Sequence, residues 1–172
     1  MTTAEPTSSL RTVYESWPSL NARVRDRVAQ LSVKRLAHRP DRERWPLWAT
    51  IGHQACQRIF WLCDFAGAPG AKDTPFPNAG WACPGDDDLE HVWSAKDLAA
   101  ALDSTFKVIA WCLDNWTSGD LAEEVFHDDW PESPRQTRAW ALQRVFIHDV
   151  WHAAELNDAL LRAGQDGIEM WS

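Results

Sequence analysis

Apolar residues recur at three- and four-residue steps through four stretches of this chain, and clusters of proline, glycine and aspartate separate the stretches. This period matches one face of an α-helix, and the alternation typical of strands is almost absent. The helical stretches run from about Ser9 to Leu31, Pro46 to Phe65, Ser94 to Trp116 and Gln136 to Ala163. The sequence therefore predicts an all-α fold, a four-helix bundle.

Residues at the ends of these stretches support the helix boundaries. Pro18 is expected to kink the first helix, whereas Pro46 suits the first turn of the second. Ser94-Ala-Lys-Asp97 is a variant of the capping box that begins a helix. Gly67 and Gly164 are suited to the positions just after helix ends.

The connection between the second and third helices is long. It runs from Gly67 to about Val92 and contains four prolines and four glycines before residue 86. A connection of this length is too long to be a plain turn. We expect it to cover a site as a lid. A second loop rich in proline and acidic residues, His127 to Pro134, leads into the last helix.

The chain of 172 residues falls in the size range of one domain, so we expect a single domain over 1–172 with a disordered start at 1–8. Hydrophobic residues make up 45% and charged residues 24%, as in ordinary globular proteins. The four cysteines show neither CxxC pairs nor the density of a disulfide scaffold. We therefore expect most of them to be reduced, buried thiols.

The net charge of −8 would repel a phosphate backbone, which argues against a nucleic-acid partner. The first ten residues, MTTAEPTSSL, lack the basic and apolar regions of a signal peptide. No uncharged apolar run reaches the roughly 18–20 residues needed to span a bilayer. The sequence thus predicts a cytoplasmic protein without a membrane partner.

Three of the six histidines are predicted to face the bundle interior. His148 and His152 lie four residues apart, so they share one helix face with Val145 and Leu156. His53 lies on the apolar stripe of the second helix. One such histidine alone is more often a core residue that is hydrogen-bonded to a neighbour. Three converging imidazoles instead suit a divalent metal and leave a position open for catalysis.

Other residues near this predicted site have alternative interpretations. Cys56 is a candidate fourth ligand, although an inert buried thiol is the commoner outcome. Asp149 and Glu155 are candidates for orienting an imidazole or acting as a general base, and equally for solvated or capping carboxylates. The remaining histidines and the acidic run are expected to have surface roles: His38, His91, His127 and Asp86–Asp88.

Three segments carry a resemblance to a known family. They are Arg39-Pro40, the segment WPLWATIGH that ends at His53, and HDVWHAAELNDALLRAG, which begins at His148. In these segments, and in helix order along the chain, the protein resembles the DinB/YfiT-like superfamily of metal-dependent four-helix bundles. The resemblance implies that His53 on the second helix and His148 and His152 on the fourth bind nickel or zinc. Two departures, Ala153-Ala154 after the last histidine and Pro46 after Trp45, leave the subfamily open.

Members of that family with assigned activity include S-transferases and isomerases that use low-molecular-weight thiols, and many others have no known reaction. The resemblance thus implies one divalent metal, zinc or nickel, and a small thiol or electrophile as partner, with the catalytic residues unknown. Activation of a thiol is the first hypothesis and activation of water the second. A non-enzymatic bundle stapled by metal, with a stress-related or partner-binding role, is the alternative. Monomer and homodimer both remain open.

Overall fold

A computed structural model of the chain describes residues 10–78, 83–127 and 135–169. The segment 1–8, for which disorder was expected, lies outside the described residues, as do 79–82 and 128–134 within the two long loops. The described elements are α1 (Leu10–Val13), α2 (Trp17–Ala29), α3 (Val33–Leu36), α4 (Leu47–Ile59), the π-helix η1 (Phe60–Phe65), the 3-10 helix η2 (Ala71–Asp73), α5 (Ala95–Asn115), α6 (Ser118–Ala122), β1 (Glu124–Val125), β2 (Gln136–Thr137) and α7 (Arg138–Arg162).

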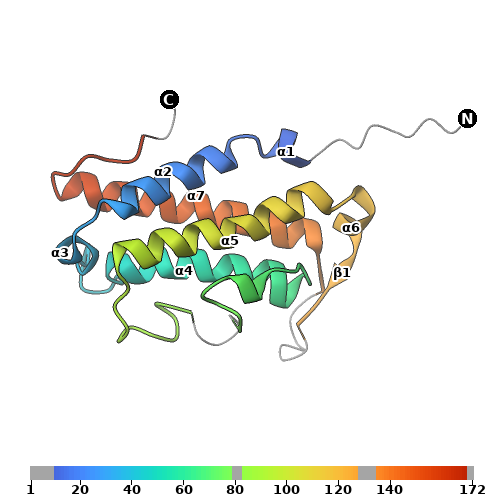
Figure 1. Cartoon of the computed structure of the whole chain (residues 1–172), viewed down its shortest axis with the longest axis horizontal. Helices are drawn as coiled ribbons and strands as arrows, with labels where there is room; N and C mark the ends of the chain where they lie inside the picture. Colours follow the sequence, from blue (N-terminus) through green and yellow to red (C-terminus); the bar gives the residue numbers. More distant parts are fainter. Residues whose placement is uncertain (1–9, 79–82, 128–134, 170–172) are drawn as a thin grey trace, which may run out of the picture.

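Four long helices form the predicted bundle (Figure 1). α5 packs against both α2 and α4, and α4 packs against α7. The long connection after η1 returns along the bundle, so that α4 and α5 run in the same direction while α2 and α7 run in the opposite one (Figure 1). The metal-site prediction needs α4 and α7 to be neighbours, and in this topology they are antiparallel neighbours.

The first predicted helix is divided in two. α1 ends at Val13, a turn follows, and α2 begins at Trp17 with Pro18 in its first turn. Pro18 therefore opens a helix instead of kinking one, because a proline in the first turn has no intrahelical hydrogen bond to lose. Trp17 is fully buried. It is in edge-to-face contact with Phe146 of α7, the ring centroids lying 5.1 Å apart.

The other helix boundaries agree with the sequence to within about two residues. Ser94 caps α5 by accepting a hydrogen bond from the backbone N–H of Asp97 at 3.2 Å. The second helix does reach Phe65, but its last turns form the π-helix η1, which the sequence did not predict. Gly67 and Gly164 follow the second and last helices with positive φ values of 74° and 65°. Such values suit glycine because it has no Cβ.

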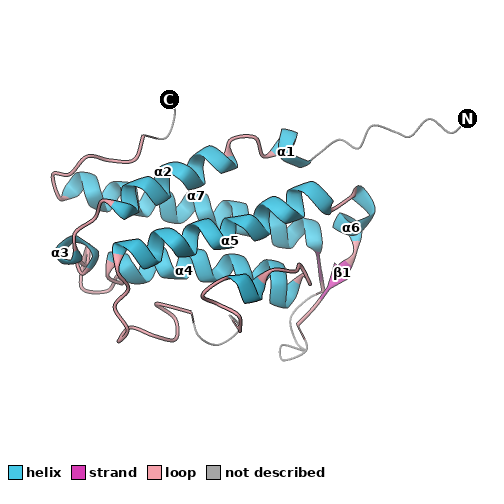
Figure 2. Cartoon of the chain, in the orientation of Figure 1, coloured by secondary structure: helices cyan, strands magenta, loops and turns pink. Residues whose placement is uncertain are grey.

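Three of the short elements missed from the sequence, α6, β1 and β2, lie at one end of the bundle (Figure 1). α6 begins with a complete capping box between Thr117 and Asp120. β1 and β2 form a two-residue antiparallel ladder in which Glu124 faces Thr137 (Figure 2). This ladder aligns the chain for the start of α7, where the Thr137 side chain accepts a hydrogen bond from the backbone N–H of Trp140 at 3.2 Å.

The expectation of reduced thiols is wrong for two cysteines. Cys56 of α4 and Cys83 of the long connection form a disulfide. Of the remaining two, Cys112 is a buried free thiol and Cys63 a partly buried one. Burial raises the pKa of the Cys63 thiol to about 11, so it is protonated and unreactive near neutral pH. The disulfide ties the middle of the connection to α4 one turn beyond His53.

A charged node lies at the centre of the bundle. Arg58 of α4 and Asp149 of α7 are each only 1% exposed, and a guanidinium nitrogen lies 2.9 Å from a carboxylate oxygen. Asp149 also accepts hydrogen bonds from the Trp17 indole at 2.7 Å and the Gln54 amide at 3.3 Å. The Asp149 carboxylate therefore links α2, α4 and α7. In the part of the chain that the structure describes, no helix combines the length and apolar character needed to cross a membrane.

Candidate metal centre

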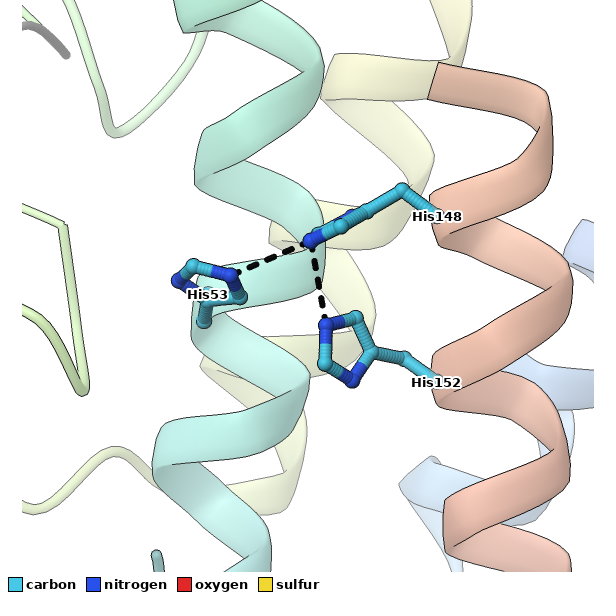
Figure 3. Close-up of side chains that lie close together, drawn as sticks. All are labelled: His53, His148 and His152. Carbon is cyan, nitrogen blue, oxygen red and sulfur yellow. Dashed lines mark hydrogen bonds between the residues drawn. The ribbon is translucent and has the colours of Figure 1, made fainter. Parts of the chain in front are cut away.

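The three histidines singled out from the sequence converge on one point (Figure 3). His53 extends from α4 and His148 and His152 from successive turns of α7. The Nε2 atom of His148 lies 3.1 Å from that of His53 and 3.0 Å from that of His152. The three histidines can each offer a ligand atom within 4.8 Å of the others. Zinc–nitrogen bonds of about 2.0–2.1 Å place ligand nitrogens roughly 3 Å apart, so these separations suit one ion.

Carboxylates on the far side of two rings orient the imidazoles. His152 Nδ1 donates to Glu155 at 2.7 Å, which leaves its Nε2 with a free lone pair. His53 Nδ1 lies 3.1 Å from an Asp86 oxygen, at an angle outside hydrogen-bond geometry. The proximity still favours a proton on Nδ1 and a lone pair on Nε2 of His53.

With these tautomers, a cation is the simplest partner for the lone pairs of the three histidines. The His53 and His152 lone pairs both point at the Nε2 atom of His148 (Figure 3). A proton on that atom can be donated to only one of them. A metal ion placed among the three nitrogens would instead accept all three lone pairs.

The electrostatics of the site keep the rings neutral, which is the form that binds metal. Burial, together with the charge of His152, lowers the pKa of His53 to about 3. Burial also lowers the pKa of His148, assisted by His152, His53 and Arg144. Burial lowers the pKa of His152 as well, although the hydrogen bond to Glu155 opposes the shift. All three imidazoles are therefore uncharged at neutral pH, and each can offer the lone pair of one nitrogen to a metal without first losing a proton.

Asp86 reaches the site because the 83–88 turn packs closely on the protein. A Cβ added to Gly52 would lie 2.9 Å from Pro84, and one added to Gly85 would lie 2.7 Å from the Trp45 ring. The Trp45 ring in turn lies 4.9 Å from the His53 ring, centroid to centroid. Asp86 is exposed, as expected for the acidic run, with 47% of its side chain accessible, and it also lies beside the His53 ring.

Asp149 is excluded as a base at the site by its position. Although it follows His148 in sequence, its carboxylate is buried and bonded to Arg58, Gln54 and Trp17. Glu155, in contrast, hydrogen-bonds His152 and so orients its ring, which is one of the roles that the sequence suggested for this residue. Its other oxygen accepts from Arg44 at 3.0 Å.

The remaining candidates lie outside the cluster. Cys56 is joined to Cys83, so its sulfur is not available as a fourth ligand. His38 and His91 are exposed, and His91 Nδ1 bonds to Asp88 at 2.6 Å on the surface. His127 is partly buried, with its ring 5.7 Å from that of Phe60. Among the residues described, the only set of three or more His, Cys, Asp or Glu side chains that could hold a metal is the histidine trio.

Two hollows open beside the trio, and Trp151 lines both of them. The larger, with a volume of about 380 Å³, is the Arg144 groove, lined by Trp140, Gln143, Arg144, Ile147, His148, Trp151 and His152. The smaller, of about 200 Å³, is the Arg44 pocket, lined by Pro40, Glu43, Arg44, Trp45, Leu47, Thr50, Trp151, His152, Glu155 and Leu156. His152 lines both.

The rim of the site differs from the expectation of a lid. The lining residues of the two hollows come from 40–50 and from α7, and none of the described residues of Gly67–Val92 is among them. The described part of this connection instead supplies Asp86 and the disulfide partner Cys83. Three indoles contribute to the rim: Trp45, Trp140 and Trp151.

Comparisons with known proteins agree with this architecture. The sequence model of the DinB superfamily matches residues 19–156, which include all three histidines. A solved structure described as a DinB-like protein from Bacillus cereus ATCC 10987 is similar in fold, with a TM-score of 0.66. The match covers 92% of this chain and 95% of that one at 15% sequence identity. No curated protein sequence is significantly similar to the chain.

Proposed function

The chain belongs to the DinB superfamily, and from this premise we propose that it is a metal-dependent enzyme that activates a low-molecular-weight thiol for attack on an electrophile. His53, His148 and His152 would hold the ion, with zinc and nickel as the candidate metals. The observation that supports this proposal is the convergence of three neutral imidazole nitrogens at the edge of two hollows.

A divalent metal supplies Lewis acidity, which lowers the pKa of a thiol or of water so that the nucleophile is available near neutral pH. The chain's own residues have supporting roles. Glu155 accepts a hydrogen bond from His152 Nδ1, and the Asp86 carboxylate lies 3.1 Å from His53 Nδ1, so both acidic residues favour Nε2 as the atom that faces the site. The trio leaves a tetrahedral ion one ligand short, and no other described His, Cys, Asp or Glu joins it.

Two alternative functions would use the same three histidines. Hydrolysis would use the same open position with water as the nucleophile. A metal with a purely structural role would not need to be reached by a substrate. The Arg144 groove opens beside His148 and His152 and so favours the enzymatic function.

Metal analysis tests the foundation of the proposal. We expect about one divalent transition metal per chain in the purified protein and a severalfold lower content in His148→Ala, because two remaining ligands compete poorly for the ion. His91→Ala is the matched control, since His91 is exposed and outside the cluster. Equal metal content in all three proteins would remove the metal hypothesis.

Chelation and activity then separate the functions. Removing the metal should lower the melting temperature and leave the bundle folded, because binding to the native state stabilises it by linkage. Metal-loaded protein should accelerate the reaction of several small thiols with an activated aryl chloride, and chelated protein should not. Acceleration of ester hydrolysis alone would favour water as the nucleophile. Unfolding on chelation, with neither activity, would favour the staple.

A further inference from the structure

The Arg144 groove is built from two adjacent rows of α7. Residues three and four apart on a helix are neighbours on its surface, so the groove residues form two ridges that run along the helix. One ridge consists of Trp140, Arg144, His148 and His152, and the other of Gln143, Ile147 and Trp151. The groove therefore extends from two metal-site histidines, past a cation, to an indole.

Arg144 is held in place by aromatic rings. Its guanidinium carbon lies 4.4 Å from the centroid of Trp61 and 5.4 Å from that of Trp140. Cation–π contacts of this kind position a guanidinium while leaving its N–H groups free to donate. Arg144 is exposed and has no carboxylate partner among the described residues.

The second arginine beside the site differs in this respect. Arg44 lines the smaller pocket and pairs with Glu155 at 3.0 Å and with Asp41 at 3.3 Å. Its charge is therefore balanced within the protein. The charge of Arg144 is not balanced in this way, so the larger hollow carries an oriented positive charge next to the proposed metal position.

We propose that the Arg144 groove binds a substrate with a carboxylate at one end, an apolar body, and its reacting atom at the histidine trio. Arg144 pairs with the carboxylate, while Trp140 and Trp151 pack against the body. This assignment of a substrate class rests on the proposed function, because it takes the trio as the place of reaction.

The dimensions of the groove limit the substrate. Arg144 and His148 are one helical turn apart, with Cβ atoms separated by about 5–6 Å, so a small molecule can contact the Arg144 side chain and the trio together. A substituted benzene ring is of a suitable size for both contacts. A single guanidinium balances one negative charge, which favours a carboxylate over a phosphate dianion. The volume of about 380 Å³ is in the lower range of small-molecule sites.

Two probes that differ only in charge test the proposal, para-mercaptobenzoate and para-mercaptobenzamide. Each would be titrated into cobalt-substituted protein, with the visible cobalt spectrum reporting binding at the metal and calorimetry reporting total affinity. Wild-type protein should bind the benzoate about tenfold more tightly than the benzamide, the scale of one charge-assisted hydrogen bond at an exposed position.

Variants of Arg144 assign the preference to its charge. Arg144→Gln should abolish the benzoate preference while leaving benzamide affinity within about twofold of wild type, and Arg144→Lys should restore part of the preference. Arg162→Gln is the matched control, because Arg162 is an exposed arginine at the far end of α7. It should bind both probes as the wild type does.

The two readouts distinguish failure of this inference from failure of the proposed function. Cobalt spectra that respond to both probes without a preference that depends on Arg144 would overturn the carboxylate assignment and leave the function standing. A calorimetric preference lost in Arg144→Gln, with a cobalt spectrum that neither probe changes, would support the anion site and overturn thiol binding at the metal. Absence of both signals would overturn both.

Discussion

Replacing Asp149 by asparagine tests whether this residue, adjacent to His148, is a structural residue or a catalytic one. Its carboxylate forms the buried pair with Arg58 and accepts from Trp17 and Gln54. The Asp149→Asn substitution keeps the side-chain size and removes the charge. Arg58 would then remain as an unpaired buried cation, although its bonds to Leu102 and Thr105 would persist.

The expected loss is large because both partners are only 1% exposed, so water cannot solvate the guanidinium in place of the carboxylate. Removing one partner of a buried ion pair typically costs about 3–5 kcal/mol. Domains of this kind have a total stability of roughly 5–15 kcal/mol, so the variant should remain folded but close to its limit. Its melting temperature should fall by about 10 °C.

Urea unfolding followed by circular dichroism measures this loss, with Asp158→Asn as the control. Asp158 lies on the same helix and pairs with Arg162, but both side chains are exposed, so the control should lose less than about 0.5 kcal/mol. The structural role also requires that folded Asp149→Asn protein still bind metal, with a smaller loss of metal affinity from the weakened link between α4 and α7 than His148→Ala shows. A loss below 1 kcal/mol, or loss of metal without loss of stability, would refute the assignment.

Two further predictions concern the surroundings of the site. Glu155→Gln should weaken metal binding about 10–100-fold in competition with a chelator, because the carboxylate that orients His152 becomes neutral; unchanged affinity would show that Glu155 has no part in orienting the ring. Joint replacement of Cys56 and Cys83 by alanine should lower the free energy of unfolding by about 3.5 kcal/mol, the loop-entropy value for a sequence separation of 27 residues. Thiol titration of unfolded, unreduced wild-type protein should detect two free thiols, and four would contradict the disulfide.

The four long helices could be predicted because each buries one stripe over several turns, which leaves a clear period in the sequence. Local signals fixed several ends, as at Ser94 and Gly164. Deviations from the regular period could not be read in this way. In the π-helix at Phe60–Phe65 each backbone hydrogen bond spans five residues instead of four, and the segment has only six residues, all apolar except Asp64. Such a short segment gives no distinct period.

The convergence of the three histidines could be predicted for a related reason. A histidine on an apolar helix stripe stands out, and the spacing of His148 and His152 places both side chains on one face whatever the rest of the fold does. Asp86 offered no comparable signal. It belongs to a run of three aspartates, of which Asp87 caps the turn at the backbone N–H of Cys83 and Asp88 bonds to His91. Only the path of the loop decides which carboxylate meets His53.

The disulfide was missed for the same physical reason. Cys56 lies on a helix and Cys83 on a loop 27 residues later, and their separation depends on how the connection returns across α4. Close packing of the turn, with Pro84 against Gly52 and Gly85 against Trp45, brings the loop back to the helix. The sequence contains these residues, but the contacts between them are tertiary.

The adjacent residues His148 and Asp149 show how the bundle holds the site in register. Neighbouring positions on a helix point about 100° apart, so His148 faces the trio while Asp149 faces the core between α2 and α4. Asp149 binds Arg58 and Gln54 of α4, and Gln54 directly follows His53. The buried node thus fixes the spacing of α4 and α7 at the level where His53 and His148 bring their nitrogens to 3.1 Å. A metal site requires its side chains to be placed within roughly 0.5 Å, and a helix pair linked one residue away from His53 and His148 can provide this precision.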